Sequence, residues 1–311
     1  MFSYIFKKII NKITIFFWQK HQVGGGLYLR RKRNNKIKKI LFYLDDSDYM
    51  HLGDHLFFEP LIRELNNYFM IEVTPTSQMR DYFEFNKINI NTTPDFADFD
   101  LIITKVEFLN FFKKSKQQIL FIDTTFNEIN QPLCLSLINR VSGFLNINNT
   151  KDKTGKPSNF AIKNHKIDCL LNKNTNYIIF NNYVLSGWFR TDRWQKNKLI
   201  SVVKKLKTDY GHKIIHIGTK TDKYNDTKKY DFVDIDLRGK TNISDMFYLF
   251  SKKNIIYNVS FDTFQMMVAF MSNKKSWVAS RHRIINNNTI FIKKHVHLFF
   301  KSNNVSLINY V

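Results

Sequence analysis

The first residues with clear chemical potential form an acidic turn that follows an apolar stretch near residue 40. Asp45, Asp46 and Asp48 come directly after the run IKKILFYL, and Gly53 and Asp54 follow a few residues later. Ligands of open α/β sheets collect at the carboxyl ends of the strands, where a carboxylate can act as a base or hold a metal ion. Asp54 is also a residue type favoured at the N-cap of a helix. The spacing leaves both roles open.

His51 lies in the same turn and is the alternative proton acceptor to Asp54. The chain contains neither a GxGxxG fingerprint nor a Walker A pattern, so no dinucleotide redox cofactor is expected. The run from Asp45 to Asp48 resembles the spaced acids of metal-dependent enzymes only superficially. No metal ion and no other cofactor is therefore expected.

A second candidate turn lies in the stretch 181–194. Ser186 and Gly187 offer small groups there, and Arg190 and Arg193 add positive charge. The planar guanidinium fork donates two hydrogen bonds to phosphate oxygens. Arginines are also common on any basic surface, so the pattern alone is weak.

A third candidate is the start of a predicted helix at Asp262 and Thr263. The free backbone N–H groups and the positive end of the dipole at a helix start suit a diphosphate. Asp262 can equally serve as a helix cap alone.

Alternating strands and helices must position these turns. In the first half, apolar runs predict strands at 37–44, 69–74, 100–104 and 118–123, with an amphipathic helix over 56–68. The second half repeats the alternation, with strands at 177–180, 213–217, 232–236, 254–259 and 276–279 and helices at 195–209, 244–251 and 262–271. Such alternation calls for parallel sheets covered on both faces. The expected fold class is α/β, with two Rossmann-like lobes facing across a cleft.

The predicted organisation has five parts. They are a basic N-terminal segment at 1–35, a first lobe at 36–150, a linker at 151–175, a second lobe at 176–285 and a C-terminal segment at 286–311. The linker is placed where apolar periodicity is poor and Lys, Asn, Gly and Pro gather.

The segment 1–35 has the pattern of a basic amphipathic helix. Apolar residues recur at helical spacing from Phe2 to Phe17, lysines occupy much of the remaining surface, and consecutive glycines end the pattern. Lysines interrupt the apolar stretch and no small-residue cleavage site follows, so a signal peptide is not expected. A helix packed on the first lobe and a helix lying on an anionic membrane surface both fit the pattern.

Composition limits the class of partner. The 311 residues include 48 Lys and Arg against 26 Asp and Glu, a net charge of +22 that favours nucleic acid, anionic lipid or a phosphorylated acceptor. No zinc finger, RNP-like motif or helix-turn-helix pattern occurs, so nucleic acid is not the expected partner.

Cys134 and Cys169 lack metal-ligand spacing, and no apolar run reaches the roughly 18 residues of a membrane span. The cytoplasm is the expected compartment.

Five short motifs occur in order between residues 37 and 285. They are Leu52-Gly53-Asp54 with Pro60 and Leu65, Arg193-Trp194, Gly218, the stretch 236–241 followed by Ile243, and Asp262-Thr263. Their order and spacing resemble the family of ADP-heptose:lipopolysaccharide heptosyltransferases and their relatives. That family has the GT-B fold, so the resemblance implies the same fold here.

The resemblance also implies roles for the matching residues. Asp54 would be the general base that deprotonates the acceptor hydroxyl. Ser186, Gly187 and Arg190 or Arg193 would approach the donor diphosphate, with the helix start at Asp262 and Thr263 placed against the phosphates. Asp222 would contact the ribose of the nucleotide, and Thr241 would lie near its base.

Three positions depart from the family pattern. Phe264 stands where the family has a glycine, Met267 where it has a histidine, and Asp192 where it has a lysine. A phenylalanine at that turn would crowd the close approach of backbone to a phosphate. Either the donor differs from ADP-heptose, or the pocket is rearranged or degenerate.

The resemblance predicts an inverting, metal-independent glycosyltransferase with a nucleoside diphosphate sugar as donor. Its acceptor would be a lipopolysaccharide, a lipooligosaccharide or another surface glycan, reached from the cytoplasm or from the inner face of the cytoplasmic membrane. The alternatives are a pyruvyl or phosphate-sugar transferase on a similar frame, and a non-catalytic scaffold with a degenerate donor site. By the same resemblance, the segment 286–311 would return to the first lobe.

Overall fold

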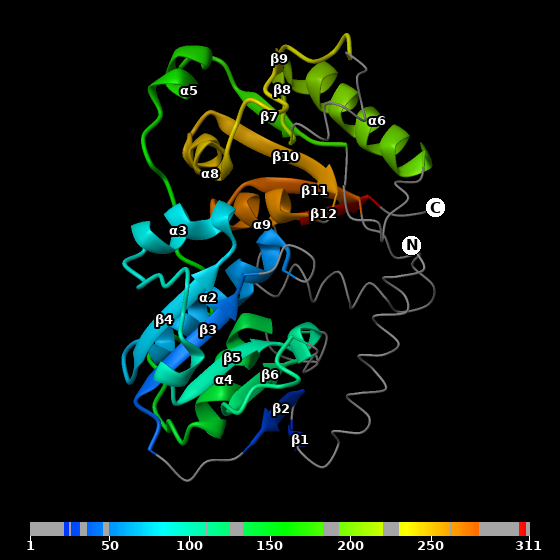
Figure 1. Cartoon of the computed structure of the whole chain (residues 1–311). Helices are drawn as coiled ribbons and strands as arrows, with labels where there is room; N and C mark the ends of the chain where they lie inside the picture. The colour runs from blue at the N-terminus through cyan, green and yellow to red at the C-terminus, as the bar shows by residue number, and fades with distance from the viewer. Residues whose placement is uncertain are drawn as a thin grey trace. The chain divides into compact units, whose positions relative to one another are not determined.

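The chain folds as two α/β units that adjoin in the sequence between Ser158 and Asn159 (Figure 1). The computed structural model describes residues 22–24, 26–31, 36–45, 50–109, 111–124, 133–182, 193–219, 230–261, 263–279 and 305–308. The boundary between the units falls inside the stretch 151–175 that the sequence assigns to a linker.

The first unit is built on a sheet of six strands in the order β1-β2-β6-β5-β3-β4. Their bounds are β1 Gln22–Gly24, β2 Leu27–Arg30, β3 Lys39–Leu44, β4 Met70–Pro75, β5 Leu101–Lys105 and β6 Ile119–Ile122. Strands β3 to β6 are parallel, as predicted. Three consecutive residues of β3, Ile40, Leu41 and Phe42, have no exposed surface, so the sheet is covered on both faces. β2 pairs antiparallel with β6, which brings part of the segment 1–35 into this sheet.

Helix α2, Leu52–Leu65, follows β3 and packs against α4, Leu133–Phe144. It begins before the predicted start at residue 56, because the capping box between His51 and Asp54 closes its first turn. The unit also contains α3 Arg80–Phe85 and the 3₁₀ turns η2 Ser77–Met79, η3 Phe96–Asp98 and η4 Val106–Leu109.

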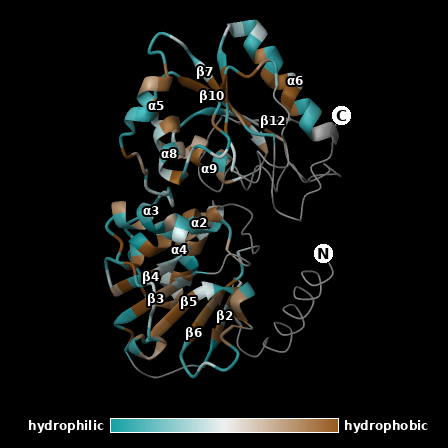
Figure 2. Ribbon diagram, turned by 45° about the horizontal axis from the view of Figure 1, so that its top comes forward, coloured by the Kyte–Doolittle hydropathy of each residue, from teal (hydrophilic) through white to brown (hydrophobic). Residues whose placement is uncertain are grey.

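The second unit is built on a parallel sheet in the order β12-β11-β10-β7-β8-β9. Its strands are β7 Tyr177–Phe180, β8 Lys213–His216, β9 Ile235–Asp236, β10 Ile255–Phe261, β11 Lys275–Ala279 and β12 Val305–Ile308, and its helices are α5 His165–Leu170, α6 Arg193–Tyr210, α8 Ile243–Ser251 and α9 Phe264–Met271. Val259 of β10 lies in the core cluster with α6, while its neighbour Asn258 bonds to Gln265 of α9. Because successive strand residues point to opposite faces, α6 and α9 cover opposite faces of the sheet. Figure 2 shows hydrophobic colour along the central strands, such as β5 and β6 of the first unit and β7 of the second.

The predicted elements of the second half are confirmed, and two features lie beyond them. Helix α5 lies within the predicted linker. Strand β12 pairs with β11, so this part of the segment 286–311 extends the second sheet instead of returning to the first lobe. The predicted N-terminal helix lies outside the described residues. No helix in the described part of the chain is long and apolar enough to cross a bilayer.

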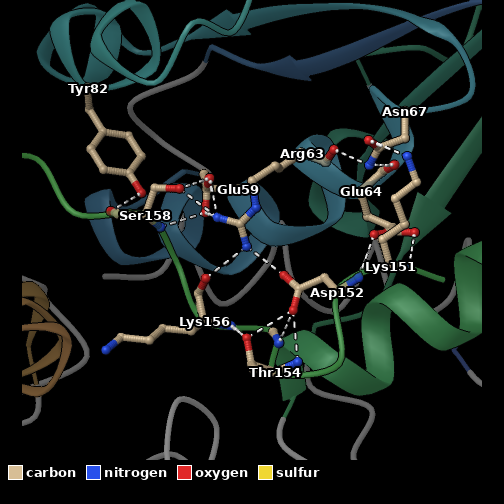
Figure 3. A network of polar contacts seen from close by, with 11 residues as sticks. Glu59, Arg63, Glu64, Asn67, Tyr82, Lys151, Asp152, Thr154, Lys156 and Ser158 are labelled. Carbon is tan, nitrogen blue, oxygen red and sulfur yellow. Dashed lines mark hydrogen bonds and ion pairs between the residues drawn. The ribbon is translucent and has the colours of Figure 1, made fainter.

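Residues 151–158, the first part of the predicted linker, are held on α2 by hydrogen bonds and ion pairs of Glu59, Arg63 and Glu64 (Figure 3). Glu59 is fully buried and accepts hydrogen bonds from the backbone N–H of Ser158 at 3.0 Å and from its hydroxyl at 2.8 Å. Arg63 donates to Glu59 at 3.1 Å and to Asp152 at 2.5 Å. Glu64 accepts from the backbone N–H of Asp152 at 2.8 Å. Residues 151–158 are therefore a rigid part of the first unit.

Candidate functional site

Asp54 is the third residue of α2 and closes the first turn of that helix. Its Oδ2 accepts the backbone N–H of His51 at 2.9 Å, and its own N–H donates to the His51 carbonyl at 2.9 Å. His51 is the N-cap residue. The prediction that Asp54 is the N-cap residue is therefore wrong. Asp54 is the third residue of the helix, and its side chain closes the capping box by accepting the N–H of the N-cap residue His51.

A second interaction of Asp54 reaches across the unit to Lys105, the last residue of β5. The Lys105 Nζ lies 2.8 Å from Asp54 Oδ2, and the two side chains are 5% and 12% exposed. Lys105 Nζ also lies 3.8 Å from Glu107 Oε1. The sequence interpretation missed Lys105. The available signal was its place at the end of the apolar run DLIITK, since parallel strands deliver their carboxyl ends to one edge.

This ion pair fixes the charge of Asp54. Burial raises the pKa of the Asp54 carboxyl, but the Lys105 ammonium and the N–H of His51 outweigh burial and hold the pKa below its ordinary value. Asp54 is consequently ionised at neutral pH. Both of the hydrogen bonds that described residues donate to the carboxylate go to Oδ2, and 12% of the side chain remains exposed. Oδ1 accepts no hydrogen bond from the described residues.

His55 holds the first turn of α2 from the other side. The backbone N–H of Thr76 donates to His55 Nε2 at 3.2 Å, so the ring proton lies on Nδ1 and faces the His51 carbonyl oxygen at 3.2 Å. Burial lowers the pKa of His55 to about 4, and the ring is neutral at physiological pH. His51, the alternative base, is exposed beside Asp54.

The predicted donor-binding residues belong to the second unit. Ser186, Gly187, Arg190, Asp222 and Asp262 lie outside the described residues. Arg193 is the first residue of α6, Thr241 is half-buried just before α8, and Thr263 is the N-cap of α9. The Thr263 hydroxyl is buried and has no hydrogen-bond partner in the described part of the chain. A hydroxyl at a helix start can donate to an anion there.

The packing of α9 explains two of the residues that depart from the family pattern, Phe264 and Met267. The ring of Phe264 meets Phe247 of α8 edge to face, with 6.0 Å between centroids. Met267 is 5% exposed. Both side chains therefore contribute to packing within the second unit.

The stretch 236–241 is shaped by a glycine and a buried arginine. Gly239 has φ of 69°, and its N–H donates to the carbonyl of Gly218 at 2.8 Å, which ties the ends of β8 and β9 together. Arg238 is 3% exposed and pairs with Asp236, with Nη2 2.8 Å from Oδ2. Burial raises the pKa of Asp236, but hydrogen bonds from Arg238 outweigh it and bring the pKa to about 2. These contacts fix the turn that carries Thr241.

Two further polar residues sit where β7 and β8 end, and the sequence interpretation did not identify them. Asn182 Oδ1 lies 3.1 Å from His216 Nε2, and Asn182 Nδ2 donates to the Tyr230 hydroxyl at 2.6 Å. Asn182 and His216 are both buried. Across the described ranges, no three histidine, cysteine or carboxylate side chains gather as they would around a metal ion.

Three solved glycosyltransferase structures share this architecture. The glycosyl transferase family 9 protein from Veillonella parvula matches with a TM-score of 0.58 and 11% identity over 90% of this chain and 89% of that one. The E. coli ADP-heptose lipopolysaccharide heptosyltransferase II matches with a TM-score of 0.58 and 12% identity over 88% and 91%. The dodecameric iron-containing glycosyltransferase TibC from enterotoxigenic E. coli matches with a TM-score of 0.50 and 10% identity over 87% and 62%.

No protein-family model matches the sequence, and no curated protein matches it. The identities are low, so the likeness concerns the fold. At that level the resemblance predicted from the motifs is confirmed. The chain has the two-unit GT-B fold of the heptosyltransferase-like glycosyltransferases.

Proposed function

We propose that the chain is a glycosyltransferase that moves a sugar from a nucleoside diphosphate donor to a hydroxyl of a lipopolysaccharide, a lipooligosaccharide or another surface glycan. The observation that carries the proposal is the state of Asp54. This carboxylate is buried at the carboxyl edge of the first sheet and kept ionised by Lys105, with one oxygen left for a substrate. The shared GT-B fold supports the same assignment.

In the proposed reaction, the acceptor hydroxyl attacks the anomeric carbon from the side opposite the leaving group. The new C–O bond forms as the bond to the diphosphate oxygen breaks, so the configuration at the anomeric carbon inverts. The hydroxyl proton passes to Asp54 Oδ1. Lys105 acts on Asp54 rather than on the substrate: it orients the carboxylate and keeps it unprotonated before the acceptor binds.

The leaving nucleoside diphosphate would be stabilised by the second unit. Arg190, Arg193, Ser186 and Gly187 would supply charge and small polar groups, and the helix start at Thr263 would supply N–H donors. Asp262 would assist at that helix start, Asp222 would bind the ribose, and Thr241 would lie near the nucleotide base. These cationic groups and N–H donors make the proposed mechanism independent of a divalent ion.

The proposed setting is the cytoplasm, where the protein would work peripherally at the inner face of the membrane. The basic amphipathic pattern of residues 2–18 supports this part of the proposal. A lipid-anchored acceptor would then be presented at the same surface.

A scaffold that keeps the fold without turnover is the second candidate. Phe264 and Met267 favour it, because both positions serve packing where the related enzymes have a glycine and a histidine. A pyruvyl or phosphate-sugar transferase is a further alternative, and in the same experiment it would transfer no glycosyl group from the nucleotide-sugar donor.

The test combines binding and turnover. Thermal stabilisation of the full chain by ADP, GDP, UDP and CDP should single out at least one nucleotide, whereas a scaffold responds to none. Transfer from the corresponding sugar donor to glycolipid extracts is then followed by mass spectrometry. Asp54→Asn should abolish the product without changing nucleotide binding, and Asp81→Asn, at an exposed position of α3, should be active. A product formed at an undiminished rate by Asp54→Asn would refute the assignment.

A further inference from the structure

The amino edge of the second sheet carries a surface that the proposed reaction does not use. Strands β7, β8, β10 and β11 are parallel, so their amino ends lie along one edge. Thr263 follows the carboxyl end of β10, at the opposite edge. In Figure 1 the arrowheads of these strands mark the carboxyl edge. The amino edge is therefore separate from the predicted donor-binding turn.

Four aromatic side chains gather at this amino edge. Tyr210, the last residue of α6, is 57% exposed and stacks on His212 at 5.6 Å. The ring centroid of Tyr257 of β10 lies 5.7 Å from that of His212 and 4.9 Å from that of Trp277 of β11. The Lys275 Nζ lies 5.6 Å from the Trp277 centroid. The rings support one another, and Tyr257 and Trp277 are only partly buried.

One exposed lysine stands at the amino end of each of the four strands. Lys173 precedes β7, Lys213 begins β8, Lys253 precedes β10 and Lys275 begins β11. None of the four forms an ion pair within the described part of the chain. Two acids near Lys173 and Lys213 in sequence are already paired with other lysines, because Asp168 pairs with Lys252 and Asp209 pairs with Lys205 at 2.9 Å. The edge therefore has an uncompensated positive charge.

We propose that this lysine–aromatic edge, formed by Lys173, Lys213, Lys253, Lys275, Tyr210, His212, Tyr257 and Trp277, binds the anionic surface of a phospholipid bilayer. Lysine ammonium groups are attracted to anionic headgroups. Tyrosine and tryptophan bury an apolar body while their polar tips stay hydrated, which suits the headgroup layer. The exposed Tyr210 supplies the apolar contact beside the lysines.

The ring geometry favours a lipid surface over single-stranded nucleic acid. Bases bind by stacking on open ring faces along a basic groove. Here one face of Tyr210 is stacked on His212 with an interplanar angle of 24°, and Lys275 lies near the Trp277 ring. The edge thus presents polar tips and ring edges together with charge.

The test is co-sedimentation of the full chain with vesicles, without donor or acceptor, so its result is independent of the transfer reaction. Vesicles contain phosphatidylglycerol in phosphatidylcholine, or phosphatidylcholine alone. Each lysine near an anionic surface contributes about fivefold in affinity, so the triple variant Lys213→Gln, Lys253→Gln, Lys275→Gln should bind anionic vesicles about 100-fold more weakly. The control replaces three exposed lysines of the first unit, Lys87, Lys113 and Lys114, and loses the same charge.

Tyr210→Ser is the second arm. It leaves the lysines intact and removes the exposed ring. Salt at 0.5 M largely screens the attraction between charges more than about 4 Å apart. Binding should therefore weaken by several-fold even at this salt concentration, because the apolar contact of Tyr210 is lost. Equal weakening by the two triple variants would overturn the proposal, because total charge and not this edge would then set the affinity. Loss of binding to a single-stranded oligonucleotide, with vesicle binding unchanged, would also overturn it. An unchanged midpoint of urea unfolding would show that each variant remains folded.

Discussion

Replacing Lys105 by methionine tests whether the ion pair sets the protonation of Asp54. Methionine keeps much of the length of the lysine side chain and removes its charge. In the wild-type protein burial raises the pKa of Asp54, and Lys105, 2.8 Å from Oδ2, helps to outweigh that effect. An opposite charge at such a distance lowers a carboxyl pKa by about 1–3 units. The pKa of Asp54 should therefore rise in the variant, because less then opposes the effect of burial.

The assay is the pH dependence of kcat/KM for sugar transfer. Only the ionised carboxylate can take a proton, so activity is lost as the pH falls through the pKa of Asp54. The acidic limb of the profile should move to higher pH in Lys105→Met and stay in place in Lys114→Met, which alters an exposed lysine. An unmoved limb in a folded, active Lys105→Met protein would refute the reasoning, because the titrating group would then lie elsewhere.

The remaining contacts set expectations for three other variants. Asp54→Asn should lower turnover by about 10²–10⁴-fold. Urea unfolding should show a loss of about 3 kcal/mol, not the roughly 1 kcal/mol of a lost cap, because the buried Lys105 loses its nearest counter-charge. The pKa of His55 is lowered from 6.5 to about 4, so the free energy of unfolding of the wild-type protein should fall by about 3 kcal/mol as the pH drops through that range. Urea unfolding measured at several pH values should show that this loss is absent in His55→Gln. Phe264→Ala should cost about 2 kcal/mol with nucleotide affinity unchanged, whereas a tenfold gain in affinity would show that the ring crowds the phosphates.

The strands were predictable because their apolar runs are short and bounded by polar residues. The bounds of β7, Tyr177–Phe180, are those that the sequence predicts. The strand β12, Val305–Ile308, was not predicted, because a run of this length between polar residues is too short to separate from a loop. Its assignment depends on pairing with β11, which is a tertiary contact.

In the candidate site too, the residues that belong to a local sequence pattern were predictable, and those that depend on tertiary contacts were not. Asp54 was identifiable because the strand-to-helix turn is a local pattern in the sequence. Its partner Lys105 lies 51 residues further along, and only the pairing of β3 with β5 brings the two strand ends to one edge. The role of Phe264 likewise depends on the ring of Phe247, which belongs to another helix.

The attachment of residues 151–158 to α2 has a consequence for synthesis of the chain. Glu59 and Glu64 are buried on α2, yet their partners Ser158 and Asp152 are translated 99 and 88 residues later. Until those residues leave the ribosome, Glu59 has only Arg63 of its own helix as a partner and Glu64 lacks the backbone N–H donors of the later segment, which costs several kcal/mol. The first unit should therefore complete its folding only after Ser158 has left the ribosome. A gene fragment that stops at residue 150 should yield an unstable product, and one that stops after residue 158 should yield a folded one.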